Sequence, residues 1–189
     1  MLPKGRETPR GLQLQAKVDD CHPGAFANWP NLSQADLTLV GAYIVLFSYI
    51  DLNLRRMAET LELAGDLPCQ VKSGVAALTI TDVEKLLLRA EWAPPNRKAL
   101  EDIQELRQFR NLLAHFAIKR FPEDDAFLFM TKSARDYRRE FGQEAPPGAL
   151  LTAVVEVEQV RAVIPRLQGL DSWLATAAAE LDRYYSRTG

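Results

Sequence analysis

The chain has 189 residues, of which 47% are hydrophobic and 25% are charged, and its formal net charge is −2 at pH 7. This length and composition fit one globular domain with a substantial core, and the small net charge gives no global sign of nucleic-acid binding. The two cysteines, Cys21 and Cys69, lie far apart and outside any CxxC pair. Their spacing argues against a structural zinc site and against a disulfide framework.

The N-terminal sequence does not resemble a targeting segment. "MLPKGRETPRG" carries charges and prolines, and no apolar run follows it as in a signal peptide. The longest uncharged run lies between Asp36 and Asp51, which is shorter than the roughly 20 apolar residues of a membrane span. We therefore expect a cytoplasmic protein with no membrane partner.

Residues 1–32 are expected to form an irregular N-terminal arm, because they contain four prolines and little periodicity. Within this arm, "GLQLQAKV" (residues 11–18) alternates apolar and polar residues and predicts a short strand.

A long helix is predicted after the arm. Ser33 or Asp36 can cap its N-terminus, and Gly65 ends it. Its first half, "LTLVGAYIVLFSYI", is apolar nearly all round, which predicts burial on several sides, as in the centre of a bundle or at a subunit interface. We therefore expect a homodimer. Asp51 falls on the apolar stripe of this helix, where a carboxylate needs a partner or a proton.

Two further helices are predicted in the middle of the chain. The second, "TITDVEKLLLRAEW", has Thr81 as its expected cap and Glu84 as the capping-box partner, and it should stop before the proline pair that follows. The third should run from about Asn96 to Phe121, where the next residue, a proline, closes it.

A small β-excursion is predicted at about residues 122–155. "PEDD" indicates a turn, "AFLFM" a strand and "TKSARDYRREFGQEAPPG" a polar loop, and "ALLTAVVEV" is a second strand that can pair with "AFLFM" as a hairpin. The last helix should span roughly residues 156–186, with Pro165 kinking it or breaking its first part. The predicted fold is therefore mainly α: an antiparallel helical bundle (residues 33–189) with a small β-hairpin excursion before the last helix.

Positive charge gathers in two stretches. Residues 97–120 hold six cations against three acids, and residues 132–139 hold four against one, so each has a local charge of +3. Such stretches can meet a phosphate chain, or they can be solvated faces without a partner.

The third helix carries an arginine among apolar residues. At 100° per residue, Arg110 falls inside the broad apolar arc near its rim, and Arg107 lies at the edge of the opposite, polar side. A buried guanidinium keeps its proton and needs an anion or several acceptors. We predict an ion pair between Asp51 and Arg110; the alternative is that Arg110 reaches solvent along the rim of the arc.

His115 is the better placed of the two histidines for general acid–base chemistry. His22 lies in the proline- and glycine-containing "CHPGAF", whereas His115 lies one turn after Asn111 on the same polar face of the third helix. Asn111 can hydrogen-bond the imidazole or a substrate phosphate. The alternative is a half-exposed histidine without a role.

The stretch "RNLLAH", Arg110 to His115, resembles the Arg–x4–6–His motif of HEPN domains (higher eukaryotes and prokaryotes nucleotide-binding), with the polar Asn111 directly after the arginine. The motif lies in the later part of a long helix, preceded by "ALEDIQELRQF". The first helix, "AYIVLFSYIDLNLRR", is similar to HEPN first helices in having an acid within an apolar run. The resemblance covers roughly residues 36–186.

This resemblance implies a metal-independent endoribonuclease of the toxin or defence type. It would cleave single-stranded RNA by attack of the 2′-hydroxyl on the neighbouring phosphorus, in a cleft where the motifs of two subunits meet. His115 would move protons, Arg110 would stabilise the phosphate and Asn111 would position it; Arg107 and Lys119 are further candidates for substrate binding. No metal-ligand cluster or glycine-rich phosphate loop is found in the sequence, so no metal and no cofactor is expected. A nucleotidyltransferase-like antitoxin on a separate chain is an expected partner.

Two questions stay open at the level of sequence. Arg110 and His115 are five residues apart, about 140° around an ideal helix, so they share a cleft only through the length of the arginine, a distortion of the helix or a second copy. Otherwise Arg110 faces inward to Asp51, and only Asn111 and His115 line the cleft. The alternative functions are a non-catalytic helical dimerisation or interaction module, and a nucleotide-binding HEPN relative.

Overall fold

A computed structural model of the chain describes residues 8–91 and 96–188. The residues cluster into two compact units. Of the described residues, the sheet unit comprises 8–44 and 108–164, and the helical unit comprises 45–91, 96–107 and 165–188. The predicted division at residue 32 into an N-terminal arm and a bundle domain stays a prediction.

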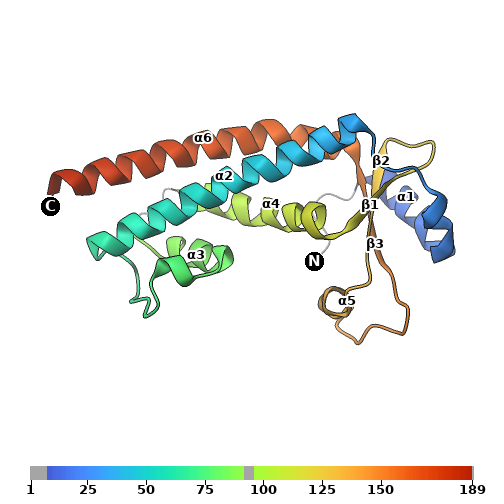
Figure 1. Ribbon diagram of the computed structural model, residues 1–189, viewed down its shortest axis with the longest axis horizontal. Coiled ribbons are helices and arrows are strands. Elements are labelled where there is room, and N and C mark those ends of the chain that lie inside the picture. Colours follow the sequence, from blue (N-terminus) through green and yellow to red (C-terminus); the bar gives the residue numbers. More distant parts are fainter. Residues whose placement is uncertain (1–7, 92–95, 189) are drawn as a thin grey trace. The chain divides into compact units, whose positions relative to one another are not determined.

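The described part of the chain is mainly helical, with one three-stranded antiparallel sheet of order β1-β2-β3 (Figure 1). This confirms the coarse prediction of a mainly α fold with a small β-excursion before the last helix. The elements are α1 (Pro9–Asp19), η2 (Pro23–Asn28), α2 (Gln34–Ala64), η3 (Val75–Ala77), α3 (Ile80–Leu87), α4 (Arg97–His115), β1 (Ala117–Arg120), β2 (Ala126–Thr131), α5 (Ala134–Phe141), β3 (Leu151–Glu156) and α6 (Val157–Thr188).

Residues 9–19 form the helix α1, so the predicted strand at residues 11–18 is wrong. The Thr8 hydroxyl accepts a hydrogen bond from the Gly11 N–H at 2.9 Å and caps the helix. Leu14 and Val18, four residues apart, are each 2% exposed. The alternation of Leu12 and Leu14 suggested a strand, yet Leu12 is 53% exposed, and the buried spacing is that of a helix.

The sheet is buried on both faces around β2. On one face, Ala126 and Leu128 belong to a cluster with Leu14, Val18 and Phe26 from α1 and η2, and Figure 1 shows α1 beside the strands. On the other face, the Phe129 ring lies 5.9 Å from Phe109 of α4, which in turn lies 5.3 Å from Tyr43 of α2. Burial on two sides explains why "AFLFM" is a continuous apolar run. The predicted pairing of "AFLFM" with "ALLTAVVEV" is confirmed, from Ala126↔Glu156 to Thr131↔Leu151.

The helix α4 ends at His115, which is six residues earlier than predicted. Residues Ala117–Arg120 form β1 instead and pair antiparallel with β2, with Ala117 opposite Met130. The outer edge of β1 is also engaged, because the Arg120 N–H donates to the Pro30 carbonyl at 2.9 Å. Helix propensity in this segment is therefore overridden by hydrogen bonds that only the assembled sheet can offer.

The outer strand on the other side, β3, receives a side chain from α1. Gln15 Oε1 accepts the Val154 N–H at 3.0 Å, and Gln15 Nε2 donates to the Thr152 hydroxyl at 3.1 Å. These bonds and the buried Leu14 and Val18 fix α1 to the sheet unit.

Part of the predicted polar loop is the helix α5. The Ser133 hydroxyl accepts the Asp136 N–H at 3.2 Å, and Gly142 ends the helix with a positive φ of 70°. Both cap signals are present in the sequence, and the polar composition of the segment concealed them.

The helix α2 has the predicted bounds and caps. The Ser33 N–H donates to the Asp36 carboxylate at 2.8 Å, and the Asp36 N–H donates to the Ser33 hydroxyl at 3.2 Å, which is a reciprocal capping box. At the other end, the Gly65 and Asp66 N–H groups bond to the carbonyls of Glu62 and Leu61, with φ of 76° at Gly65.

The helical unit has its own core, formed by side chains of α2, η3, α3, α4 and α6. The side chains that are 0% exposed are Phe47, Ile50, Leu54, Met57, Ala58, Val75, Val83, Leu87, Ile103, Leu106, Leu167, Leu174 and Ala178. The cap of α3 is Thr79, which accepts the Asp82 N–H at 3.3 Å, and not Thr81 as predicted. The helix ends at Leu87, with Leu88 as its C-cap, and residues 88–91 form turns, so the predicted continuation to Trp92 is wrong. The helix α6 continues through Pro165 without a break.

By length and composition, α2 is the one described helix that could cross a membrane, with a mean hydropathy of 1.6 over its most apolar window. Core helices of soluble proteins pass the same test, so this is weak evidence for a membrane span. The side chain of Asp51, on this helix, is paired with an arginine of the helical unit.

Candidate functional site

A buried cluster of three charged side chains lies in the helical unit. Arg107 Nη2 donates to Asp51 Oδ1 at 2.6 Å, and Arg107 Nε donates to Glu84 Oε1 at 2.7 Å. The Arg107 guanidinium also lies 5.0 Å from the centre of the Phe47 ring. The side chains of Arg107 and Glu84 are 8% and 2% exposed, whereas that of Asp51 is 22% exposed.

Two acids share one cation in this cluster. Burial raises the pKa of Glu84, and the adjacent Arg107 only partly offsets this rise. Asp51 has a charged partner, as expected, but the predicted pair with Arg110 is wrong. The Asp51 carboxylate pairs with Arg107, which lies one turn before Arg110 on α4. The sequence placed Arg107 at the edge of the polar side of the helix. It did not predict that Glu84 of α3 supplies Arg107 with a second hydrogen-bond acceptor.

Arg107 is therefore a structural residue in the helical unit. Its Nε and Nη2 bond to carboxylates and its side chain is buried, so these contacts give no support to its predicted role in substrate binding. The cluster can hold α2, α3 and α4 of this unit together, because each of the three helices supplies one charge.

The predicted motif residues lie in the sheet unit, on the last turns of α4. Arg110 Nη1 is 3.4 Å from Asn111 Oδ1, a long hydrogen bond. Arg110 Nε is buried and has no hydrogen-bond partner, and no carboxylate pairs with Arg110 among the described residues. The guanidinium therefore retains donors that an anion could accept.

Asn111 and His115 are both exposed and lie four residues apart, on one face of α4. The contact between Arg110 and Asn111 turns the guanidinium towards this face. This contact places Nη1 of Arg110 beside Asn111; that Arg110 and His115 share one cleft stays a prediction. His115 is the last residue of α4.

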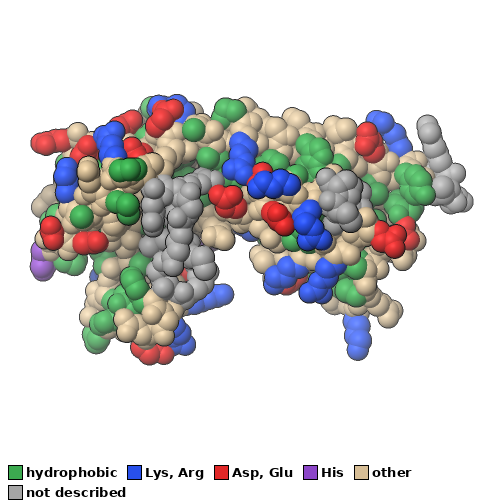
Figure 2. Space-filling model, turned by 180° about the vertical axis from the view of Figure 1, so that it is seen from behind, with side chains coloured by type: hydrophobic (Ala, Val, Ile, Leu, Met, Phe, Trp, Pro, Cys, Tyr) green, Lys and Arg blue, Asp and Glu red, His purple; other side chains and the backbone are tan. Residues whose placement is uncertain are grey.

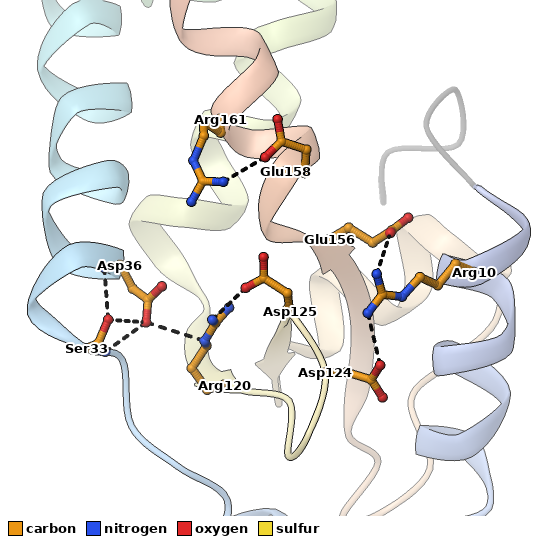
Figure 3. Close-up of polar contacts among 9 residues, drawn as sticks. All are labelled: Arg10, Ser33, Asp36, Arg120, Asp124, Asp125, Glu156, Glu158 and Arg161. Atoms are coloured by element: carbon orange, nitrogen blue, oxygen red, sulfur yellow. Dashed lines mark hydrogen bonds and ion pairs between the residues drawn. The ribbon is translucent and has the colours of Figure 1, made fainter.

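Three other arginines of the sheet unit, Arg10, Arg120 and Arg161, differ from Arg110 in having carboxylate partners (Figure 3), although Arg120 Nη1 is also buried without a hydrogen-bond partner. Arg120 lies 2.6 Å from Asp125 and 3.5 Å from Asp36. Arg10 lies 3.0 Å from Asp124 and also approaches Glu156. These ion pairs connect α1, α2 and the strands, so their arginines hold the fold.

Lys119 is partly engaged within the protein. Its ammonium donates to the Trp29 carbonyl at 3.2 Å and to Asn31 Oδ1 at 2.7 Å. These bonds place Lys119 at the edge of a pocket of the sheet unit, described below. Its predicted role in binding RNA stays a prediction.

A comparison with known proteins finds no matching family model, protein or solved structure. The HEPN resemblance therefore rests on the residues of "RNLLAH" and on their place in a long helix.

The described residues include no group of three or more His, Cys, Asp or Glu side chains that could hold a metal ion. Cys21 is partly buried and Cys69 is exposed, and both are free thiols. Acidic and basic side chains are interspersed over the face drawn in Figure 2, with no continuous patch of one sign among its coloured side chains. Any recognition of an anion on this face therefore depends on individual side chains.

Proposed function

We propose that the chain is a HEPN-like, metal-independent endoribonuclease that cleaves single-stranded RNA. The observation that carries the proposal is the state of Arg110: a guanidinium without a carboxylate partner, with a buried and unsatisfied Nε, directed towards Asn111. A buried donor without an acceptor costs free energy, and a phosphate oxygen is a strong acceptor for arginine.

The proposed chemistry uses Arg110, Asn111 and His115. The imidazole of His115 from one copy accepts the proton of the 2′-hydroxyl, whose oxygen bonds to phosphorus while the bond from phosphorus to the 5′-oxygen breaks. His115 of a second copy gives a proton to the leaving 5′-oxygen. Arg110 stabilises the charge on the phosphate oxygens, and Asn111 positions the phosphate. The products are a 2′,3′-cyclic phosphate and a 5′-hydroxyl.

Exposed apolar side chains on α2 support a homodimer. Within the helical unit, Val45, Tyr49 and Leu52 are 51%, 53% and 62% exposed, and their spacing of four and three residues puts them on one face of the helix. Exposed apolar residues in a row favour association. In the proposal, the dimer works in the cytoplasm, and a nucleotidyltransferase-like chain is its antitoxin.

The same α2 face supports a second candidate, a non-catalytic dimerisation module. In that case the α2 face is used and the Arg110 site is idle, so the two candidates separate by RNA cleavage.

The test uses the purified full chain and labelled single-stranded RNA in the presence of a chelator. We expect fragments that end in 2′,3′-cyclic phosphate, and a loss of roughly 10²–10⁴-fold in rate for His115→Ala and for Arg110→Ala. The matched controls are His22→Asn, which keeps a side-chain acceptor for the Gly24 N–H, and Arg183→Ala, an exposed arginine of α6. Both controls should cleave like the unchanged chain, and thermal melts should show that all variants fold.

Three results would contradict the proposal. If the His115→Ala variant still cleaves RNA, the assignment of the site is wrong. If cleavage requires magnesium, the metal-independent mechanism is wrong. A chain that forms dimers by light scattering but leaves every RNA intact supports the dimerisation module.

A further inference from the structure

A mostly apolar pocket of about 470 Å³ lies in the sheet unit. It is bounded by η2, by β1, by the end of β2 and by the turn that precedes β3. Its lining residues are Pro23, Gly24, Phe26, Ala27, Ala117, Lys119, Met130, Thr131, Lys132, Gly148 and Leu150. The volume falls within the range of about 300–1,000 Å³ that is typical of small-molecule sites.

The pocket exists because the side chains that pack on one face of the sheet do not cover that face completely. Near Leu128, the side chain of Phe26 covers this face, and Phe26 is 4% exposed. Beyond it, the small Ala117 stands opposite Met130 in the strand register, and Met130 and Leu150 are only partly buried. Gly148 adds no side chain and has a φ of 77°. Apolar surface is thus left accessible at a concave place.

Both charged residues of the pocket lining are lysines. The Lys119 ammonium gives two hydrogen bonds, to the Trp29 carbonyl and to Asn31. An ammonium has three donors, so one remains for a ligand. Lys132 is exposed, and no ion pair neutralises it among the described residues. The pocket therefore combines an apolar floor with two cations and no acid in its lining.

We propose that this pocket binds a small organic anion with an apolar body, of the class of medium-chain carboxylates. The body lies on Met130, Leu150 and the alanines, where burial of each methylene contributes about 0.8 kcal/mol. The carboxylate pairs with the Lys132 ammonium or with the remaining donor of Lys119. This ligand is distinct from the RNA of the proposed function, and its binding does not depend on cleavage.

The experiment is calorimetric titration of the full chain with decanoate, decanol and decylamine. We expect decanoate to bind, decanol to bind more weakly and decylamine not to bind. Lys132→Ala should weaken decanoate roughly two- to five-fold, as expected for the loss of one exposed charge contact, and added salt should reduce the difference between decanoate and decanol. Arg135→Ala, an exposed arginine outside the pocket lining, is the matched control and should leave the affinity unchanged.

A second pair of variants tests the location. Ala27 and Ala25 are both exposed on η2, but only Ala27 lines the pocket. Ala27→Trp should fill the pocket and abolish decanoate binding, whereas Ala25→Trp should not. Decanoate binding that survives Ala27→Trp places the ligand elsewhere and overturns the proposal. Equal binding of decanol and decanoate overturns the role of the lysines, and displacement of decanoate by single-stranded RNA assigns the pocket to nucleic acid instead.

Discussion

Replacing Arg107 by methionine should cost about 3–5 kcal/mol of the free energy of unfolding, the range for removing one partner of a buried ion pair. The magnitude follows from the Glu84 carboxylate, which stays in the protein without its partner. Glu84 is 2% exposed, so its carboxylate would keep its desolvation and lose the guanidinium that now lies 2.7 Å away. Methionine preserves much of the apolar stem that packs near Phe47, so the loss reports chiefly the missing charge.

The loss should depend on pH. The pKa of Glu84 is raised in the folded chain by burial, with Arg107 acting against the rise. Without Arg107, the pKa of Glu84 rises further. Above the ordinary value of 4.5 and below this raised pKa, Glu84 is protonated in the folded state and ionised in the unfolded state. Stability then falls as pH rises through this window. The variant should therefore be closer to the unchanged chain at about pH 5 than at about pH 7.

Urea unfolding followed by circular dichroism at both pH values measures this effect. Lys98→Met, which removes the exposed cation of the Lys98–Asp102 pair on the same helix, is the control and should change little. Adding Glu84→Leu to Arg107→Met should recover much of the loss, because the unpaired carboxylate is gone. A loss below about 1 kcal/mol for Arg107→Met, the size expected of an exposed pair, would refute the reasoning. An equal loss at both pH values would refute the assignment to Glu84.

Two further predictions concern the helical unit. The Tyr185 hydroxyl donates to the Asp66 carboxylate, which raises the pKa of Tyr185 to about 12; Asp66→Asn should return it towards 10.0 in an ultraviolet titration, and an unchanged curve would show that the bond is not formed. Because the neutral phenol is the stabilised form, its contribution to stability should decline as pH rises from 10.0 towards 12. Thr79→Ala should lower the free energy of unfolding by about 1 kcal/mol through loss of a helix cap. Thr81→Ala, at the cap predicted from the sequence, should lower it much less in the same urea assay. A larger loss for Thr81→Ala than for Thr79→Ala would show that Thr81 is the cap.

The sequence predicted elements whose signals are local. The cap at Ser33 or Asp36, the helix end at Gly65 and the apolar run of β2 each depend on a few neighbouring residues, and each lies where the sequence predicted it. The pairing of β2 with β3 was predicted from an apolar, aromatic run followed by a β-branched run that could form a hairpin with it.

The errors arose where distant contacts decide the conformation. Residues 117–120 continue the pattern of α4 but pair with β2, and residues 11–18 alternate although Leu14 and Val18 are buried as a helical pair. The cluster of Arg107 depends on Glu84, 23 residues away, and no spacing in the sequence shows that contact. The residues of the candidate site were proposed from one helix, whereas the contact between Arg110 and Asn111 depends on the side-chain conformation in the folded chain.

Both rims of the small sheet are occupied by the chain itself. At β1 the Arg120 amide is taken by Pro30, and at β3 the Val154 amide is taken by Gln15. An open rim is a template on which foreign strands add and aggregates grow. Since these rims are blocked, a second copy that joined this chain would do so through helices and not by extending the β-sheet, and a chain with Gln15→Ala should become more prone to strand-mediated aggregation.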